Sequence, residues 1–295
     1  MTYFELMNTE CANTSITRME RLLPVSRAGY YAWRNATNET SPAEQLREDR
    51  KAKILHFHEK SEGTYGSPRI TTDLREAGDM VTRKTVAKLM ADAGIAGISP
   101  RTFKVRTTDV DRSALFPDDL VERNFDKGAT DLVWTSDITY LHCGEGDMYF
   151  CAVKDEHSKR ILGWSLDDHM RAELVGDALS KAAMTRCHLC RDTIFHSDRG
   201  SQYTSKVIVD LADELGLRRS MGETGVCWDN AGAESLWSTF KHEYYYRHTF
   251  ASKAELIAAV DRWVHRYNND RRHSAIGQMS PVNYEVSSAA ANNAA

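Results

Sequence analysis

Three acidic residues stand inside dense motifs, at spacings that suit a divalent-metal site. Asp198 lies in F-H-S-D-R-G-S-Q-Y-T-S, where a short strand is predicted to end and turn residues follow. Asp137 lies in W-T-S-D-I-T-Y-L, which has the composition of a strand, and Glu234 follows Asp198 with 35 residues between them. Open α/β sheets usually place their chemistry where strands end beside a helix start. We therefore interpret the three acids as ligands of divalent metal.

Phosphoryl transfer is the chemistry that such a set supports. Attack on a phosphodiester gathers negative charge on the entering and leaving oxygens. Two Mg²⁺ ions about 3.5–4 Å apart can stabilise both oxygens, and these hard cations prefer carboxylate ligands. A lone aspartate is more often a helix cap or a surface ion-pair partner. Three acids predicted at a strand end, a strand middle and a helix start favour the metal site over that simpler interpretation.

Residues 129–285 are predicted to form the domain that positions these acids. Three strand-rich runs on short connections come first and indicate an antiparallel meander. The elements predicted after the meander are a helix at about 171–187, a strand into Asp198, a helix at about 205–215 and a short strand at 217–220. This order is that of the α/β RNase H-like fold, a mixed sheet with flanking helices. Its first and fourth strands are neighbours, so we expect Asp137 and Asp198 to face each other across the sheet.

Two helices are predicted to complete this domain. Glu234 opens the first, and Lys241 lies seven residues later, so both side chains project from the same face. The second helix is predicted to span Lys253–Asn269. Residues 286–295, which are rich in Ala, Asn and Ser, are predicted to be a disordered tail.

Residues 1–128 are predicted to be a small all-α region followed by a linker. Helices are expected on either side of Pro24 and at about 43–62. Two more helices with starts at Ser67 and Thr82 have the arrangement of a helix-turn-helix that binds a DNA groove. A small helical packing module without a ligand would give the same pattern.

Cations in this region are the candidate DNA contacts. Lys84 and Lys88 share one face of the last predicted helix, with Arg83 at its start. The linker carries a cationic strip that could lie along a phosphate backbone, made of Arg101, Lys104 and Arg106.

The charge distribution agrees with this division, although most of the charges could equally be solvated surface. The 295-residue chain has a net charge of -4, which argues against a simple basic nucleic-acid binder. Residues 46–110 carry a net charge of +4, residues 111–240 carry -9, and residues 241–285 carry +2. An acidic block between basic ones suits a cation-dependent site fed by segments that touch phosphate.

Other classes of protein are disfavoured. The first residues lack an apolar run, so no signal peptide is expected, and nowhere do eighteen consecutive apolar residues indicate a membrane span. The six cysteines are scattered in a pattern typical of reduced thiols. Cys187 and Cys190 have the spacing of half a zinc site, but no second pair stands at ligand spacing.

The three acidic motifs together resemble the OrfB-type transposases of the insertion-sequence-three family, DDE relatives of the retroviral integrase catalytic core. The resemblance continues through Y-N-N-D-R-R-H-S-A-I-G and M-S-P-V-N-Y-E near the C-terminus, and through P-V-S-R-A-G-Y-Y-A-W-R and Y-G-S-P-R-I near the N-terminus. It implies that Asp137, Asp198 and Glu234 are the catalytic metal ligands, and that Lys241 contacts DNA near the cut. It further implies two Mg²⁺ ions in each active site, with Mn²⁺ as a substitute.

The function that this resemblance implies is metal-dependent cleavage and strand transfer at insertion-sequence ends, with water and then a 3′-hydroxyl as nucleophile. The alternative is a non-catalytic DNA-binding regulator of transposition, made when this frame is expressed alone. The expected partners are element-end and target DNA, further copies in a multimer on DNA, and the product of an upstream frame. Family members usually act as a fusion with that frame, which carries a coiled coil, and this chain has no heptad run. The expected location is the bacterial cytoplasm, at the nucleoid.

Overall fold

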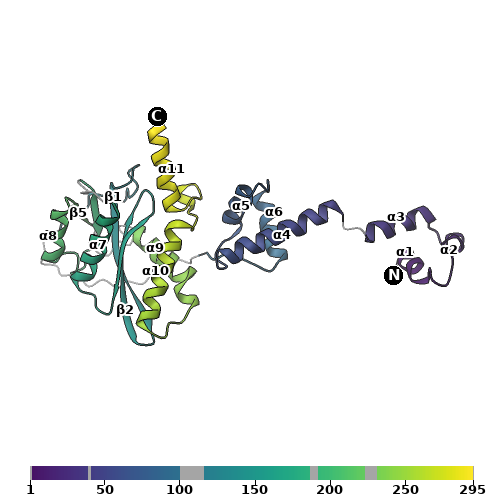
Figure 1. The fold of residues 1–295 in the computed structure, drawn as a ribbon, viewed down its shortest axis with the longest axis horizontal. Coiled ribbons are helices and arrows are strands. Elements are labelled where there is room, and N and C mark those ends of the chain that lie inside the picture. The colour runs from purple at the N-terminus through teal and green to yellow at the C-terminus, as the bar shows by residue number, and fades with distance from the viewer. Residues whose placement is uncertain (1, 39–40, 100–115, 187–191, 223–230, 295) are drawn as a thin grey trace. The chain divides into compact units, whose positions relative to one another are not determined.

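The computed structural model describes residues 2–38, 41–99, 116–186, 192–222 and 231–294 (Figure 1). Contacts divide the chain into two compact units, Met1–Gly97 and Ile98–Ala295. None of the helices in the described ranges combines the length and the apolar content that a membrane span requires.

The first unit is entirely helical, as predicted. Its helices are α1 (Tyr3–Glu10), α2 (Ile16–Leu22), α3 (Arg27–Asn38), α4 (Pro42–Lys60), α5 (Ser67–Glu76) and α6 (Arg83–Asp92). Helix α1 was not among the predicted elements; it begins with a capping box in which Thr2 and Glu5 satisfy each other's backbone N–H groups.

Helices α4, α5 and α6 surround a small core of their own. Ile54, Ile70, Leu74 and Val86 are fully buried within it. The Thr82 side chain caps α6 by accepting a hydrogen bond of 3.2 Å from the Thr85 N–H. The predicted helix starts at Ser67 and Thr82 are confirmed, and Thr82 is a side-chain cap, whereas the N-cap of α5 is Gly66, which makes no side-chain capping bond.

The second unit is built on a five-stranded mixed sheet. Its strands are β1 (Val133–Cys143), β2 (Gly146–Asp155), β3 (Ile161–Asp167), β4 (Ile194–Ser197) and β5 (Arg218–Met221). They lie in the order β3-β2-β1-β4-β5. The first three strands are antiparallel, whereas β4 is parallel to β1 and β5 is parallel to β4. The predicted meander and the predicted pairing of the first and fourth strands are both confirmed.

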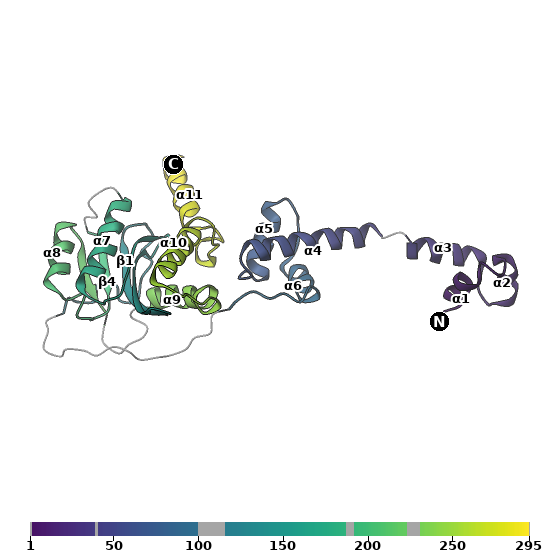
Figure 2. The same ribbon diagram turned by 60° about the horizontal axis from the view of Figure 1, so that its bottom comes forward.

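Helices cover both faces of this sheet (Figures 1 and 2). One face packs on α7 (Ala172–Arg186) and α8 (Lys206–Glu214), around Trp134 and Phe195. The other face packs on α9 (Ala231–Glu243) and α10 (Lys253–Asn269). Short 3₁₀ turns, η2 (Tyr245–Arg247) and η3 (Ser274–Ile276), follow α9 and α10. The result is a three-layer α/β/α domain in which the strand ends near Asp137 lie beside the start of α9.

The structure departs from the sequence-based boundaries in two places. Residues before 129 were predicted to be linker, but Val121 packs with Val133 and Ile194 of the sheet, so this segment belongs to the second unit. The predicted disordered tail continues α11 (Pro281–Ala294).

Two factors explain why the C-terminal residues form helix α11. Its alanine run has high helix propensity. Glu285 also anchors it, because its carboxylate lies 2.7 Å from Arg160 Nη1 and 2.8 Å from Arg186 Nη2. The small and polar residues of this segment gave no sign in the sequence that Glu285 would pair with distant arginines.

Candidate metal centre

Strand pairing makes Asp137 and Asp198 neighbours. Partners in the parallel pairing of β1 with β4, such as Val133 with Ile194, are 61 residues apart in sequence, and so are the two acids. Asp198 is the first residue after β4, where the ladder ends. The two carboxylates therefore leave adjacent strands at the same level, as the sequence predicted.

Two hydrogen bonds orient the Asp137 carboxylate. Its Oδ1 accepts from the Ile138 N–H at 2.9 Å, and its Oδ2 accepts from Trp237 Nε1 at 3.0 Å. The pKa of Asp137 is raised to about 7: burial is the largest cause, the charges of Asp198 and Glu234 also raise it, and the two hydrogen bonds act in the opposite direction. Negative charge is therefore crowded at this carboxylate.

Asp198 is held by its own turn. Its Oδ1 accepts a hydrogen bond of 2.9 Å from the Gly200 N–H. A Cβ at position 200 would lie only 2.9 Å from that same oxygen, so a larger residue there would displace the Asp198 carboxylate. Burial raises the pKa of Asp198, and the hydrogen bond from Gly200 opposes this rise.

Glu234 approaches from the first turn of α9. Its side chain is exposed, desolvation raises its pKa, and its charge contributes to the raised pKa of Asp137. The structure thus places the third acid within electrostatic reach of Asp137. It does not bring the oxygens of all three carboxylates as close together as bound metal would require.

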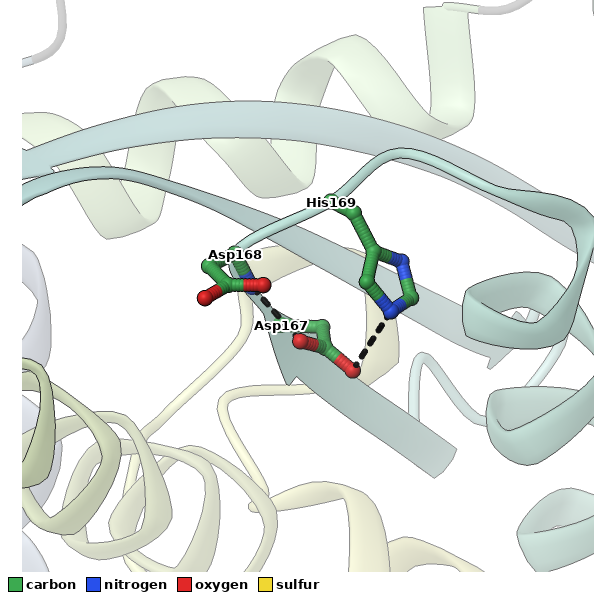
Figure 3. A group of neighbouring side chains, drawn as sticks. All are labelled: Asp167, Asp168 and His169. Atoms are coloured by element: carbon green, nitrogen blue, oxygen red, sulfur yellow. Dashed lines mark hydrogen bonds and ion pairs between the residues drawn. The ribbon is translucent and has the colours of Figure 1, made fainter.

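Within the described ranges, a different trio has its ligand atoms within 4.8 Å of one another: Asp167, Asp168 and His169 (Figure 3). His169 Nε2 lies 3.4 Å from Asp167 Oδ2. Asp168 already has a cationic partner, since its Oδ2 lies 2.9 Å from Lys253 Nζ. The trio is therefore explained as a surface ion-pair cluster.

The chemistry of the predicted acids fits a divalent cation. All candidate ligand atoms are carboxylate oxygens, which suit Mg²⁺ and Mn²⁺ and disfavour softer metals. Burial and, next, repulsion from Asp198 and Glu234 raise the pKa of Asp137, and a bound cation would offset both by stabilising the charged carboxylate. Asp137, Asp198 and Glu234 are thus a suitable donor set.

A buried ion pair supports the first turn of α9, two residues before Glu234. Lys154 and Glu156 are 4% and 2% exposed, and their Nζ and Oε1 atoms are 3.0 Å apart. Lys154 Nζ also donates to the Gly232 carbonyl at 2.7 Å. A Cβ on Gly232 would lie 2.1 Å from Glu156 Oε1, so the helix can approach this closely only with glycine. We call this pair the α9 clamp.

Lys241, on the same helix as Glu234, lies near Tyr140 of β1. Its Nζ is 5.0 Å from the centre of the Tyr140 ring. Burial lowers the pKa of Lys241, and the charge of Asp137 works against that decrease. Lys241 and Asp137 are therefore within electrostatic reach of each other.

Sequence reasoning missed four residues around this centre: Trp237, Lys154, Glu156 and Tyr140. Trp237 follows Glu234 by three residues, a helical spacing that indicates a shared face. Charged residues at the end of the otherwise apolar run of β2 were a signal for the α9 clamp. No sequence signal distinguished Tyr140 from other strand tyrosines.

Three other predicted DNA-contact cations belong to the first unit. Arg83, Lys84 and Lys88 are exposed on α6 of the first unit. The cationic strip at positions 101, 104 and 106 and the cysteine pair at 187 and 190 lie outside the described residues.

Comparisons with known proteins match both units. Integrase core domain models match residues 129–227 and 215–281, and an HTH-like domain model matches residues 45–103. Transposase InsF for insertion sequence IS3A of Escherichia coli (strain K12) is 34% identical over 277 residues, which cover 93% of this chain and 95% of InsF. The insertion element IS600 31 kDa protein of Shigella sonnei is 33% identical over 265 residues, covering 90% and 96% of the two chains.

Solved structures give weaker likenesses. A simian T-cell lymphotropic virus intasome chain has a TM-score of 0.43 at 14% identity, with 78% of this chain and 73% of that chain covered. The catalytic core domain of BIV integrase has a TM-score of 0.39 at 16% identity, with 55% and 99% covered. The fold assignment depends instead on the strand order and the domain models.

Proposed function

The chain belongs to the family of insertion-sequence transposases with an integrase core domain, and from that premise we propose that it cleaves DNA at element ends and joins the freed ends to target DNA. Membership makes it a polynucleotidyl transferase, and its HTH-like and integrase core domains indicate DNA as its partner. The observation that supports the proposal most is the matched level of Asp137 and Asp198 on adjacent parallel strands, with Glu234 within electrostatic reach.

In the proposed mechanism, Asp137, Asp198 and Glu234 would hold two divalent ions, which would supply activation of the attacking oxygen and charge stabilisation of the leaving oxygen. Trp237 keeps the Asp137 carboxylate in one orientation through its 3.0 Å hydrogen bond. The lysine at position 241 supplies a positive charge for the DNA phosphates beside the scissile bond. No side chain is needed as a nucleophile, because water and then a 3′-hydroxyl take that role.

Further parts of the proposal concern assembly. Transposition joins two element ends, so we expect several copies of the chain to act together on DNA. The product of an upstream reading frame is a proposed partner, and the nucleoid of the bacterial cytoplasm is the proposed location. These expectations follow from the family resemblance.

A metal-substitution assay tests the function. We expect cleavage of element-end DNA with Mg²⁺ or Mn²⁺ and none with Ca²⁺, because Ca²⁺ takes longer and looser coordination than the paired-ion geometry allows. The measurement is gel analysis of end-labelled DNA, with and without the upstream-frame product. Strand transfer in the presence of a chelator would contradict the proposal. DNA binding with no cleavage under any metal would favour the non-catalytic regulator.

Lys241 should affect DNA positioning and leave metal binding intact. Lys241→Ala is expected to lower end-DNA affinity about tenfold and to scatter the cut position, whereas Lys241→Arg should retain much of both. Crosslinking from position 241 to DNA near the scissile phosphate is the direct measurement. If the alanine variant cuts at the normal position and no crosslink forms, Lys241 is a surface cation that does not position DNA.

The α6 cations should bind DNA through its backbone. Replacing Arg83, Lys84 and Lys88 together with alanine is expected to weaken binding and to reduce the slope of log affinity against log salt by about 0.9 for each phosphate that is no longer neutralised. Titrations at several salt concentrations give that slope. The matched control is Arg47→Ala, since Arg47 is already paired with Asp92. An unchanged slope in the triple variant would leave the HTH-like unit as a packing module.

A further inference from the structure

Among the strands that the structure describes, β1 has a partner along nearly its whole length on one side only. Strand β2 pairs with β1 along Trp134–Cys143, but β4 pairs with it only along Val133–Thr135. Tyr245 of η2 takes the place of a strand further along this edge. Its hydroxyl accepts from the His142 N–H at 2.6 Å and donates to the His142 carbonyl at 2.9 Å. The bonds hold η2 against β1 at His142, five residues along the strand from Asp137, and form a ledge there.

Two tyrosines lie on this ledge with their rings largely in solvent. Tyr140 is 63% exposed and Tyr246 is 62% exposed. The Tyr246 ring packs edge-on against His242, with ring centres 5.5 Å apart. Burial raises the pKa of Tyr246, and the neighbouring hydroxyls of Tyr140 and Tyr245 raise it further, which places the three phenols in one neighbourhood. Neither Tyr140 nor Tyr246 belongs to a hydrophobic core of the described chain.

A cation completes the ledge. Lys241 Nζ lies 5.0 Å from the Tyr140 ring centre and within electrostatic reach of Asp137, so one ammonium neighbours both the exposed ring and an acid of the metal centre. Aromatic faces stack on nucleobases of any sequence, and an ammonium attracts phosphate. An aromatic surface next to a single cation therefore matches the two parts of one nucleotide.

We propose that Tyr140, Tyr246 and Lys241, the tyrosine ledge, bind an unpaired nucleotide next to the scissile phosphate. The base stacks on the tyrosine rings, and its phosphate lies at Lys241. This inference rests on the proposed DNA-cleaving function and adds to it that the end of the duplex opens when it is bound. A paired base keeps its faces stacked on its neighbours, so the ledge selects opened ends.

Binding of DNA that carries 2-aminopurine, measured in Ca²⁺ to prevent cleavage, tests the ledge. Element-end duplexes are compared with the same duplexes mismatched beside the cut. The wild-type chain should favour the mismatched ends and change the fluorescence of the reporter base. Tyr140→Ala and Tyr246→Ala should each lower that affinity by about tenfold, within the range expected when one stacked aromatic ring is removed. Tyr140→Phe and Tyr246→Phe should bind as the wild type does, because the ring face is kept.

Two positions of the reporter base and one control variant make the result specific. Placing the reporter on the element side or on the flanking side of the cut shows which nucleotide is held. Met184→Ala removes another exposed apolar side chain, on α7, and should change nothing. The proposal would be overturned if the alanine variants bound opened ends as tightly as the wild type and gave the same change in reporter fluorescence. Cleavage in Mg²⁺ is scored separately on the wild type, so loss of the ledge and loss of the proposed function give different results.

Discussion

Asp137→Asn, Asp198→Asn and Glu234→Gln should each lower the rate of strand cleavage by about a thousandfold or more. An amide keeps the size of the carboxylate but removes the charge that holds a divalent ion. Single-turnover cleavage of end-labelled DNA in Mg²⁺ measures the loss, and filter binding should show DNA affinity within about twofold of the wild type. A variant that cuts at the wild-type rate would show that its residue is not a ligand.

The aspartate variants should also fold well, and Asp137→Asn offers a direct check. Without metal, the folded-state pKa of Asp137 is about 7, against an ordinary value of 3.8 for the unfolded chain. The folded wild type therefore loses stability as pH rises from about 4 to about 7, and stays at that lower level above. Asparagine does not titrate, and it retains an oxygen that can accept from Trp237.

We therefore expect the Tm difference between Asp137→Asn and the wild type, both measured in chelator, to be near zero at pH 4. The difference should rise in favour of the variant and reach a plateau above pH 7. The gain corresponds to about 1–2 kcal/mol, reduced from the full shift because the carboxylate is only half-buried. Excess Mg²⁺ should cancel the gain by stabilising the wild type alone. A Tm difference that is constant with pH would show that the pKa of Asp137 is not raised in the folded protein.

The sequence predicted the acids because each lies in a motif with its own local signal. Asp198 follows a short strand and precedes turn residues, and Asp137 lies in a strand-like run, so the order of elements was enough to make them neighbours. Glu234 was predicted from its motif, its spacing from Asp198 and a predicted helix start, and the structure places it less closely. Local patterns specify which element an acid belongs to, but the final distance between carboxylates depends on how α9 packs.

What could not be predicted arises from contacts between distant residues. The α11 helix follows a tail-like pattern, and its anchor at Glu285 depends on arginines more than 90 residues away. Val121 looked like part of a linker because its partners, Val133 and Ile194, come later in the chain. Charges and small apolar residues are ambiguous in isolation, since the same residue can be solvated or buried.

The α9 clamp is such a contact, and breaking it should have the largest effect on stability. Burial works to raise the pKa of Glu156, but Lys154 and Lys159 outweigh it and lower that pKa. Glu156→Gln would remove this compensation and leave the buried Lys154 ammonium without its counter-charge. Removing one member of a buried pair costs about 3–5 kcal/mol. Urea unfolding should show this loss, whereas Lys206→Met, in the exposed pair with Asp210, should cost less than about 1 kcal/mol.

The clamp should also position Glu234, and a double variant separates that role from stability. Lys154→Met with Glu156→Leu replaces the ion pair by apolar side chains and should recover much of the stability lost in Glu156→Gln, because no charge stays buried alone. It cannot restore the 2.7 Å bond from Lys154 to the Gly232 carbonyl, which holds the first turn of α9. We therefore expect a stable protein that needs roughly tenfold more Mg²⁺ for half-maximal cleavage, because Glu234 lies only two residues after Gly232, whose carbonyl would lose its hydrogen bond. A stable double variant with wild-type Mg²⁺ dependence would limit the clamp to folding.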